Sequence, residues 1–430
     1  MTRIHLALAA SFATVLSACQ PADQGRVFAV DETAAVDETI GFRLPEGFKA
    51  TVFADDLGFA RHVTVRDDGV VYVALRRAHE GKGIVALKDE DGDNVADRIA
   101  YFGDLVGTGI DLYQGHLYYG TNTEIVRYSF AGNEMVPTAA PEVMISGFPE
   151  QRQHAAKPFT FDNAGHIYVN VGAPSNACME QARTKGSPGM TPCPQLDLQA
   201  GIWQFDADRV GQVHGTDGMN YATGIRNAMA LDWNNETNAL YFIFHGRDQL
   251  SQLFPDMFND EQNAELPSEE FHVSKGGTNH GWPYSYWNHQ TGQRMMAPEY
   301  GGDGVKEATE KYEKPLIGFP GHWAPNDMLF YKGGHFPSEF TNGAFIGFHG
   351  SWNRAPLPQR GYNIIFAPFE NGKPTGKWSV FADGFPGVDP LDSPRKARFR
   401  PMGMATDKSG ALYITDSMKG RVWKVEWVGK

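Results

Sequence analysis

A short strand signature recurs six times along this chain of 430 residues, and it constrains the fold more than any other feature. Each copy begins with a glycine or an asparagine and continues as a run of apolar and aromatic residues, a pattern typical of a buried strand that follows a turn. The copies are Gly69 to Ala74, Gly115 to Tyr119, Gly165 to Val171, Asn238 to Phe244, Gly343 to Phe348 and Gly410 to Thr415.

Most copies are followed by a second strand, namely Ile84 to Lys88, Glu124 to Phe130, Gly201 to Asp206, Tyr362 to Phe366 and Arg421 to Trp427. Helical periodicity is scarce, and short antiparallel strands must hide their edges, which radial repetition achieves. We therefore predict an all-β fold, a six-bladed β-propeller of four-stranded antiparallel blades, with a two-sheet sandwich as the alternative. The long insertions after Trp203 and after His245 are expected to build the functional face.

The N-terminal segment predicts export. Arg3 precedes an apolar stretch, Ile4 to Leu16, which is too short for a permanent membrane helix but suits a signal peptide. The sequence that follows, up to Cys19, resembles the lipobox of bacterial lipoproteins. We expect a signal peptide over 1–18, lipidation of Cys19, a flexible acidic tether over 19–43 and one domain over 44–430. Ordinary cleavage beside an incidental cysteine is the alternative.

These features predict a lipoprotein of the bacterial cell envelope that faces the periplasm and is held to the membrane only by its lipid. An oxidising compartment would allow the two remaining cysteines, Cys178 and Cys193, to form a disulfide across a loop rich in glycine, proline and serine. Two free buried thiols are the alternative. The net charge of −13 provides no excess of positive charge that could bind phosphate groups, so we expect no nucleic-acid partner.

Polar residues beside the repeated strands carry the candidate chemistry. Arg226 and Asn227 precede the fourth repeat, Gly246 and Arg247 follow it, and His154 stands just before the third repeat. In this order, these residues resemble the cofactor site of the soluble quinoprotein glucose and sorbosone dehydrogenases. The resemblance covers essentially the whole domain.

The resemblance implies pyrroloquinoline quinone (PQQ) held on Ca²⁺. Arg226 and Asn227 would contact the quinone, where a guanidinium stabilises negative charge as hydride arrives. Gly246 and Arg247 would present main-chain carbonyls to Ca²⁺, which prefers oxygen ligands. His154 would be the general base, because a free histidine is largely neutral near pH 7.

The resemblance assigns four further residues to the cofactor. Arg398 and Arg400 form an Arg–x–Arg pattern, and alternate residues of an extended segment point the same way, so both would hold carboxylates of PQQ. His349 and Arg354 lie in a run that resembles the related pyranose-oxidising quinoproteins. We therefore expect these two residues in the same pocket.

An acidic run, Asp89 to Asp97, predicts a separate structural Ca²⁺ site. Asp89, Asp91, Asp93 and Asp97 recur at spacings that can wrap oxygen atoms around one cation. A solvated acidic turn is the alternative.

The resemblance to the quinoprotein dehydrogenases implies a sugar dehydrogenase that oxidises an aldose-like sugar. His322 and Trp323 would contact the sugar, and a cytochrome c or a membrane quinone chain would accept the electrons. The second possibility is a calcium-dependent sugar lactonase, which would not need Arg226, Arg398 and Arg400. A non-catalytic, lipid-anchored propeller that binds a glycan or a protein partner is the third possibility.

Overall fold

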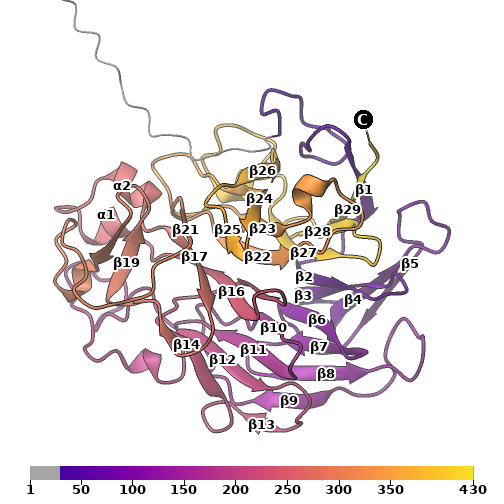
Figure 1. Cartoon of the computed structure of the whole chain (residues 1–430), viewed down its shortest axis with the longest axis horizontal. Coiled ribbons are helices and arrows are strands. Elements are labelled where there is room, and N and C mark those ends of the chain that lie inside the picture. The colour runs from indigo at the N-terminus through magenta and orange to yellow at the C-terminus, as the bar shows by residue number, and fades with distance from the viewer. Residues whose placement is uncertain (1–29, 430) are drawn as a thin grey trace, which may run out of the picture.

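The computed structural model describes residues 30–429, which fold almost entirely as strands and connecting turns. Six small sheets, in which consecutive strands pair antiparallel, form a ring around a common centre (Figure 1). Each sheet has four main strands, and three of the sheets gain a short fifth strand. The predicted six-bladed β-propeller is confirmed.

The first three blades take the chain from residue 60 to residue 223. Blade 1 contains β2 (Ala60–Val65), β3 (Val71–His79), β4 (Lys82–Lys88) and β5 (Arg98–Phe102). Blade 2 contains β6 (Gly109–Tyr113), β7 (His116–Gly120), β8 (Ile125–Ser129) and β9 (Glu142–Ser146), with β13 (Gln212–Val213) added at its edge. Blade 3 contains β10 (Phe159–Phe161), β11 (His166–Val171), β12 (Gly201–Asp206) and β14 (Met219–Thr223), with β18 (Thr278–Asn279) added.

The last three blades complete the ring. Blade 4 contains β15 (Ala230–Asn234), β16 (Ala239–Phe244), β17 (Glu269–Ser274) and β21 (Ile317–Phe319). Blade 5 contains β22 (Pro325–Phe330), β23 (Gly343–His349), β24 (Tyr362–Glu370) and β26 (Ser379–Ala382), with β25 (Lys373–Pro374) beside β24. Blade 6 contains β27 (Pro401–Thr406), β28 (Leu412–Asp416), β29 (Val422–Trp427) and the N-terminal strand β1 (Phe48–Ala54).

The insertion between β16 and β22 carries most of the structure outside the blades. It contains α1 (Leu250–Leu253), α2 (Asp260–Glu265) and the hairpin of β19 (Ser285–Asn288) and β20 (Gln293–Met296), which lie together beside blade 4 (Figure 1). Short 3-10 turns occur at Pro194–Leu196, Pro298–Tyr300, Ser338–Phe340 and Pro394–Lys396. Over residues 30–429, no helix has the length and apolarity needed to cross a membrane.

The six repeated segments are the second strands of the six blades, and each packs against the blades on both sides. In β3, Val71 and Val73 join the apolar cluster shared with blade 6, whereas Tyr72 and Ala74 join the cluster shared with blade 2. A strand that is buried on both faces needs apolar residues at every position. The repeat in the sequence is therefore the repeat of the interfaces between blades.

The ring is closed by β1, which pairs antiparallel with β29 as the outermost strand of blade 6. The chain ahead of β1 also packs on this blade. Phe42 is fully buried and stacks on Phe385, and the indole N–H of Trp423 donates to the carbonyl of Ile40. Residues 30–43, which we predicted as part of a flexible tether, therefore belong to the folded domain. The predicted signal peptide and Cys19 lie outside the described residues.

Three carboxylates carried by inner strands line a cavity of about 510 Å³, which is formed by the ends of these strands. They are Asp111 on β6, Asp232 on β15 and Asp327 on β22. Asp232 accepts a hydrogen bond from the backbone N–H of Phe330 in blade 5, and Asp327 accepts one from Met404 in blade 6. These carboxylates join neighbouring blades at the axis.

The contribution of Asp232 and Asp327 to the stability of the cofactor-free protein should fall as the pH rises from 4 to 7. Burial raises the pKa of Asp232 to about 6 and that of Asp327 well above its usual range, so the folded protein keeps protons that the unfolded chain releases near pH 4. We expect Asp232 alone to contribute a loss of about 1–3 kcal/mol, complete above its folded-state pKa. Urea unfolding at pH 4.5 and pH 7 measures this loss. If Asp232→Asn loses as much stability between pH 4.5 and pH 7 as the parent does, Asp232 is not the source of the loss.

Candidate active site

A second axial cavity, of about 1030 Å³, lies at the end of the ring where the innermost strands of the blades begin. Its wall is built by segments of all six blades, including the loop 151–156 before β10, the turn 226–229 before β15 and the segment 245–249 after β16. Residues far apart in sequence therefore converge on one volume. Of the residues that the structure describes, six arginines line it, namely Arg61, Arg76, Arg152, Arg183, Arg226 and Arg400.

One end of this cavity holds positive charge without matching carboxylates. Arg61 on β2, Arg76 on β3 and Arg400 ahead of β27 form no ion pair within residues 30–429. Burial and the charges of Arg76 and Arg400 lower the pKa of Arg61, whose Nε has no hydrogen-bond partner there. A cluster of guanidinium groups without ion-pair partners in a cavity suits an anionic ligand.

His349 lies beside this cluster, and Arg400 is held in place by main-chain oxygens. The guanidinium of Arg400 donates to the carbonyls of His349 and Gly350 at 3.0 and 2.7 Å. The ring of His349 contacts the hydroxyl of Ser417 at 2.7 Å, and burial followed by the charge of Arg400 holds its pKa well below the usual range. His349 is therefore neutral and can accept or donate one hydrogen bond without adding charge.

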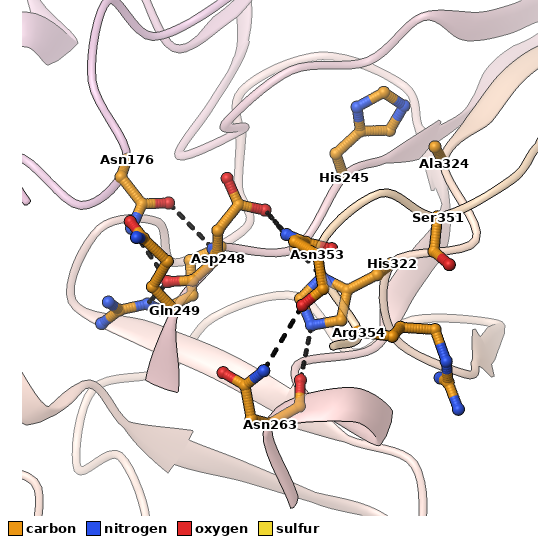
Figure 2. A network of polar contacts seen from close by, with 12 residues as sticks. Asn176, His245, Asp248, Gln249, Asn263, His322, Ala324, Ser351, Asn353 and Arg354 are labelled. Carbon is orange, nitrogen blue, oxygen red and sulfur yellow. Dashed lines mark hydrogen bonds and ion pairs between the residues drawn. The ribbon is translucent and has the colours of Figure 1, made fainter. Parts of the chain in front are cut away.

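The opposite wall holds a buried network centred on Asp248 (Figure 2). Asp248 receives Arg226 at 2.8 Å and Arg183 at 3.1 Å. Figure 2 shows its main chain beside Asn176 and its carboxylate beside Asn353, to which it is hydrogen-bonded. Burial opposes ionisation, but the charges of Arg226, His322 and Arg183 hold the pKa of Asp248 well below its usual range. Asp248 thus fixes the Arg226 guanidinium at the cavity wall.

Glu269 lines the same wall, and no cation is paired with it among the described residues. Its carboxylate accepts hydrogen bonds only from the backbone N–H groups of Gly246 and Ala324, at 3.0 and 3.1 Å. Burial raises the pKa of Glu269 to about 8. A buried carboxylate of this kind fits a site that takes a divalent cation.

Gly246 stands where we predicted the cofactor calcium. It lines the cavity, and a Cβ at this position would lie 3.0 Å from the carbonyl oxygens of Pro267 and Ser268, so a side chain would be tightly packed here. The side chain of Arg247 pairs with buried Glu299. The role predicted for Arg247 uses only its main-chain oxygen and stays a prediction.

His154 lies in the cavity and is held in one tautomer. Its Nδ1 lies 2.6 Å from the carbonyl oxygen of Ala173, which can only accept, so Nδ1 carries the proton and Nε2 keeps its lone pair. Burial, followed by the charge of Arg226, lowers the pKa of His154 to about 3. The neutral imidazole can therefore accept a proton at Nε2.

The backbone around His154 is closely packed. His154 has φ +52, and a Cβ on Gly172 would come within 2.5 Å of its Cβ and 2.6 Å of the side-chain oxygen of Asn227. Asn227 also accepts from Asn170 at 3.2 Å. Gly172 thus lets the two predicted site residues, His154 and Asn227, lie side by side.

Three predicted site residues are placed elsewhere. Arg398 pairs with Glu38 outside the cavity. The backbone N–H groups of Arg398 and Phe399 both donate to the segment 385–386, so the side chains here do not alternate as they would in a regular strand. The side chain of Arg398 therefore does not point the same way as that of Arg400, contrary to our prediction. Arg354 is fully buried and binds Glu265, so it braces its own loop.

Trp323 is the third of these residues. Its ring packs edge-on against Phe348 and Trp378, away from the cavity, whereas His322 before it does line the cavity. The His322 ring is tied to the carbonyls of Asn263 and Leu266 at 2.7 and 3.0 Å, as Figure 2 shows for Asn263. The expected aromatic contact with substrate must therefore come from another residue.

The predicted disulfide between Cys178 and Cys193 is present and buried. It crosslinks the loop that also carries Asn176, the partner of Arg226 and Asp248. The crosslink therefore stabilises one wall of the cavity.

Sequence reasoning missed Arg61, Arg76 and Glu269. Arg61 and Arg76 lie inside the strands ARHVTV and VYVALRRAH, and Glu269 begins the strand EEFHVS. Such a residue must either find a partner or face a cavity, because an isolated charge in a core is costly. The charged residues could be recognised in the sequence, but the partner or the cavity that each of them faces could not.

The fold is a six-bladed β-propeller with an axial cavity lined by arginines. The chain belongs to the TrAA12-like family, whose model matches residues 42–428. An uncharacterized protein of Borreliella burgdorferi is 28% identical over 207 residues, which are 47% of this chain. The match spans about half of that curated relative, 48% of its length.

Solved structures share the fold at low sequence identity. The holo PQQ domain of pyranose dehydrogenase from Coprinopsis cinerea has a TM-score of 0.71 at 18% identity, over 93% of this chain and 100% of that one. The iodide structure of the Trichoderma reesei carbohydrate-active enzyme of family AA12 gives 0.74 at 16% identity, over 92% and 99%. PQQ-bound aldose sugar dehydrogenase from Streptomyces coelicolor gives 0.54 at 15% identity, over 89% and 99%.

Proposed function

We propose that this protein is a PQQ-dependent sugar dehydrogenase whose active site is the axial cavity of 1030 Å³. The observation that carries the proposal is the cluster of Arg61, Arg76 and Arg400, which faces the cavity without ion-pair partners in the described chain. PQQ has three carboxylates and fits such a cluster. Membership of the TrAA12-like family and the pyranose and aldose dehydrogenases with the same fold support the same function.

Each residue of the site has a distinct role in this proposal. When bound, PQQ supplies the two-electron acceptor for the hydride that leaves a sugar C–H. His154 accepts the proton of the sugar hydroxyl at Nε2, and Ala173 keeps the ring in the required tautomer. Arg226, fixed by Asp248, places its charge where negative charge develops. The Gly246 and Arg247 carbonyls, with Glu269 nearby, would hold the Ca²⁺.

Reconstitution tests this function directly. Purified protein is mixed with PQQ and Ca²⁺, and the absorbance of bound quinone and aldose-dependent reduction of a dye are measured. A lactonase would instead hydrolyse sugar lactones with Ca²⁺ alone, and a binding module would hold glycans without turnover. The arginine cluster favours the dehydrogenase, because neither alternative needs it. A protein that binds no PQQ would contradict the proposal.

The cellular setting is part of the same proposal. The N-terminal sequence supports a lipid-anchored protein of the cell envelope, and the buried disulfide is consistent with an oxidising compartment. Electrons would pass from the reduced cofactor to a cytochrome c or a membrane quinone chain. Fractionation of cells that express the protein with and without Cys19→Ser would test the anchor.

We also propose that the acidic loop of blade 1 binds a structural Ca²⁺. Oxygen atoms of Asp89, Asp91 and Asp97 lie within 4.8 Å of one another, whereas Asp93 is outside this group and accepts from the N–H of Val95. Saturating Ca²⁺ should raise the melting temperature by a few degrees, since a ligand at 100 times its Kd adds about 2.7 kcal/mol. Asp91→Asn should abolish this part of the shift and Asp93→Asn should keep it. An equal shift in both variants would refute the site.

A further inference from the structure

Trp352 is an exposed aromatic side chain in the wall of the axial cavity. It is 58% exposed and lines the cavity together with Asn353 and Arg76. Its indole makes no ring contact or hydrogen bond with any other residue of the range 30–429. Tryptophan is usually well covered in folded proteins, so an uncovered indole at a cavity mouth marks a surface that a ligand can cover.

The loop that carries Trp352 is held firmly on the side of blade 5. Ser351 is fully buried, and its hydroxyl donates to Gln359 at 2.7 Å and accepts from the N–H of Arg360 at 2.9 Å. The carbonyl of Ser351 also accepts from the Tyr362 hydroxyl at 2.5 Å. The residue before Trp352 therefore has a fixed position.

The residues after Trp352 are fixed as well. Asn353 donates from its side chain to Asp248 at 2.5 Å, on the cavity wall (Figure 2). Arg354 is 2% exposed, donates to the carbonyl of Pro358 at 3.1 Å and pairs with Glu265 at 2.6 Å. Because both flanks are anchored, a ligand that stacks on the indole orders little additional main chain.

Groups that can bind hydroxyls share the cavity wall with Trp352. They are the side chains of Asn122, Gln153, Gln249, Arg152 and Asn353. A pyranose ring has a face of C–H groups and a rim of hydroxyls, so it matches an aromatic platform with amides and guanidiniums nearby.

We propose that Trp352 is the stacking platform for the sugar ring. This inference rests on the proposed dehydrogenase function and takes the role that Trp323 does not fill. The indole would cover one C–H face of the pyranose, and the amides and guanidiniums of the cavity wall would bind its hydroxyls. Trp352 is therefore a substrate-binding residue.

Two variants test the role of Trp352 with the reconstituted protein. Trp352→Ala should raise KM for glucose roughly two- to tenfold, because the sugar loses its aromatic stacking partner. It should leave kcat and the Kd for PQQ close to the parent values. Trp352→Phe should retain most of the affinity. An unchanged KM in Trp352→Ala would overturn the proposal.

A binding measurement without turnover separates this inference from the proposed function. Methyl β-D-glucopyranoside, which cannot be oxidised at C1, is titrated by calorimetry into the cofactor-free parent and into Trp352→Ala. If Trp352→Ala binds the glucoside more weakly than the parent does, the stacking role of Trp352 is supported. This result would hold even if the protein binds no PQQ and the proposed dehydrogenase function is wrong. Equal binding overturns the platform even if PQQ binds. A raised KM for a protein electron acceptor with an unchanged KM for glucose also overturns it, in favour of a docking role.

Discussion

Replacing His154 with alanine should lower kcat for sugar oxidation by about 10²–10⁴-fold, the usual contribution of a general base. The Ala173 carbonyl fixes the proton on Nδ1, so the loss of the ring removes the free Nε2 lone pair. PQQ should remain bound, because the arginine cluster does not involve His154. Steady-state kinetics with a dye and quinone absorbance of the same sample measure both quantities.

The matched control for this prediction is His166→Ala. His166 is on β11, its side chain is 41% exposed, and it contacts Asp162, remote from the cavity lining. This variant should keep its activity. Added imidazole should restore part of the turnover of His154→Ala, which a merely structural role would not produce. If His154→Ala turns over as fast as the parent, His154 is not the base.

Replacing Arg61 with glutamine should have opposite effects on stability and on cofactor binding. Without cofactor, the variant should be more stable by about 1–2 kcal/mol, because it removes a charge that burial and two neighbouring guanidiniums disfavour. With PQQ, it should lose roughly 10–100-fold in affinity, since a hydrogen bond between charged groups contributes about 1.5–3 kcal/mol. Urea unfolding and PQQ titration measure the two effects.

Arg398→Gln is the control for Arg61→Gln. Arg398 lies two residues from Arg400 but pairs with Glu38 outside the cavity, so its loss should leave PQQ affinity unchanged. A common structural effect would instead move stability and affinity in the same direction in both variants. Equal PQQ affinity in Arg61→Gln and the parent would show that the cluster does not hold the cofactor.

The sequence predicted the site best where a residue is fixed by its neighbours along the chain. His154, Arg226 and Asn227 each stand next to an inner strand, and the structure places all three in one cavity. The roles assigned to them stay predictions. Arg354 and Trp323 were misplaced because loops that follow turns have no period from which a side-chain direction can be read.

The number of blades was determined by the sequence alone, because the second strand of each blade buries both faces and must repeat its apolar pattern. The tertiary structure decided which charges meet. Arg61 and Arg400 are separated by most of the chain and come together only because ring closure through β1 brings blade 6 beside blade 1. A local pattern fixes a strand, but the electrostatic energy of a site depends on distances that only the closed ring sets.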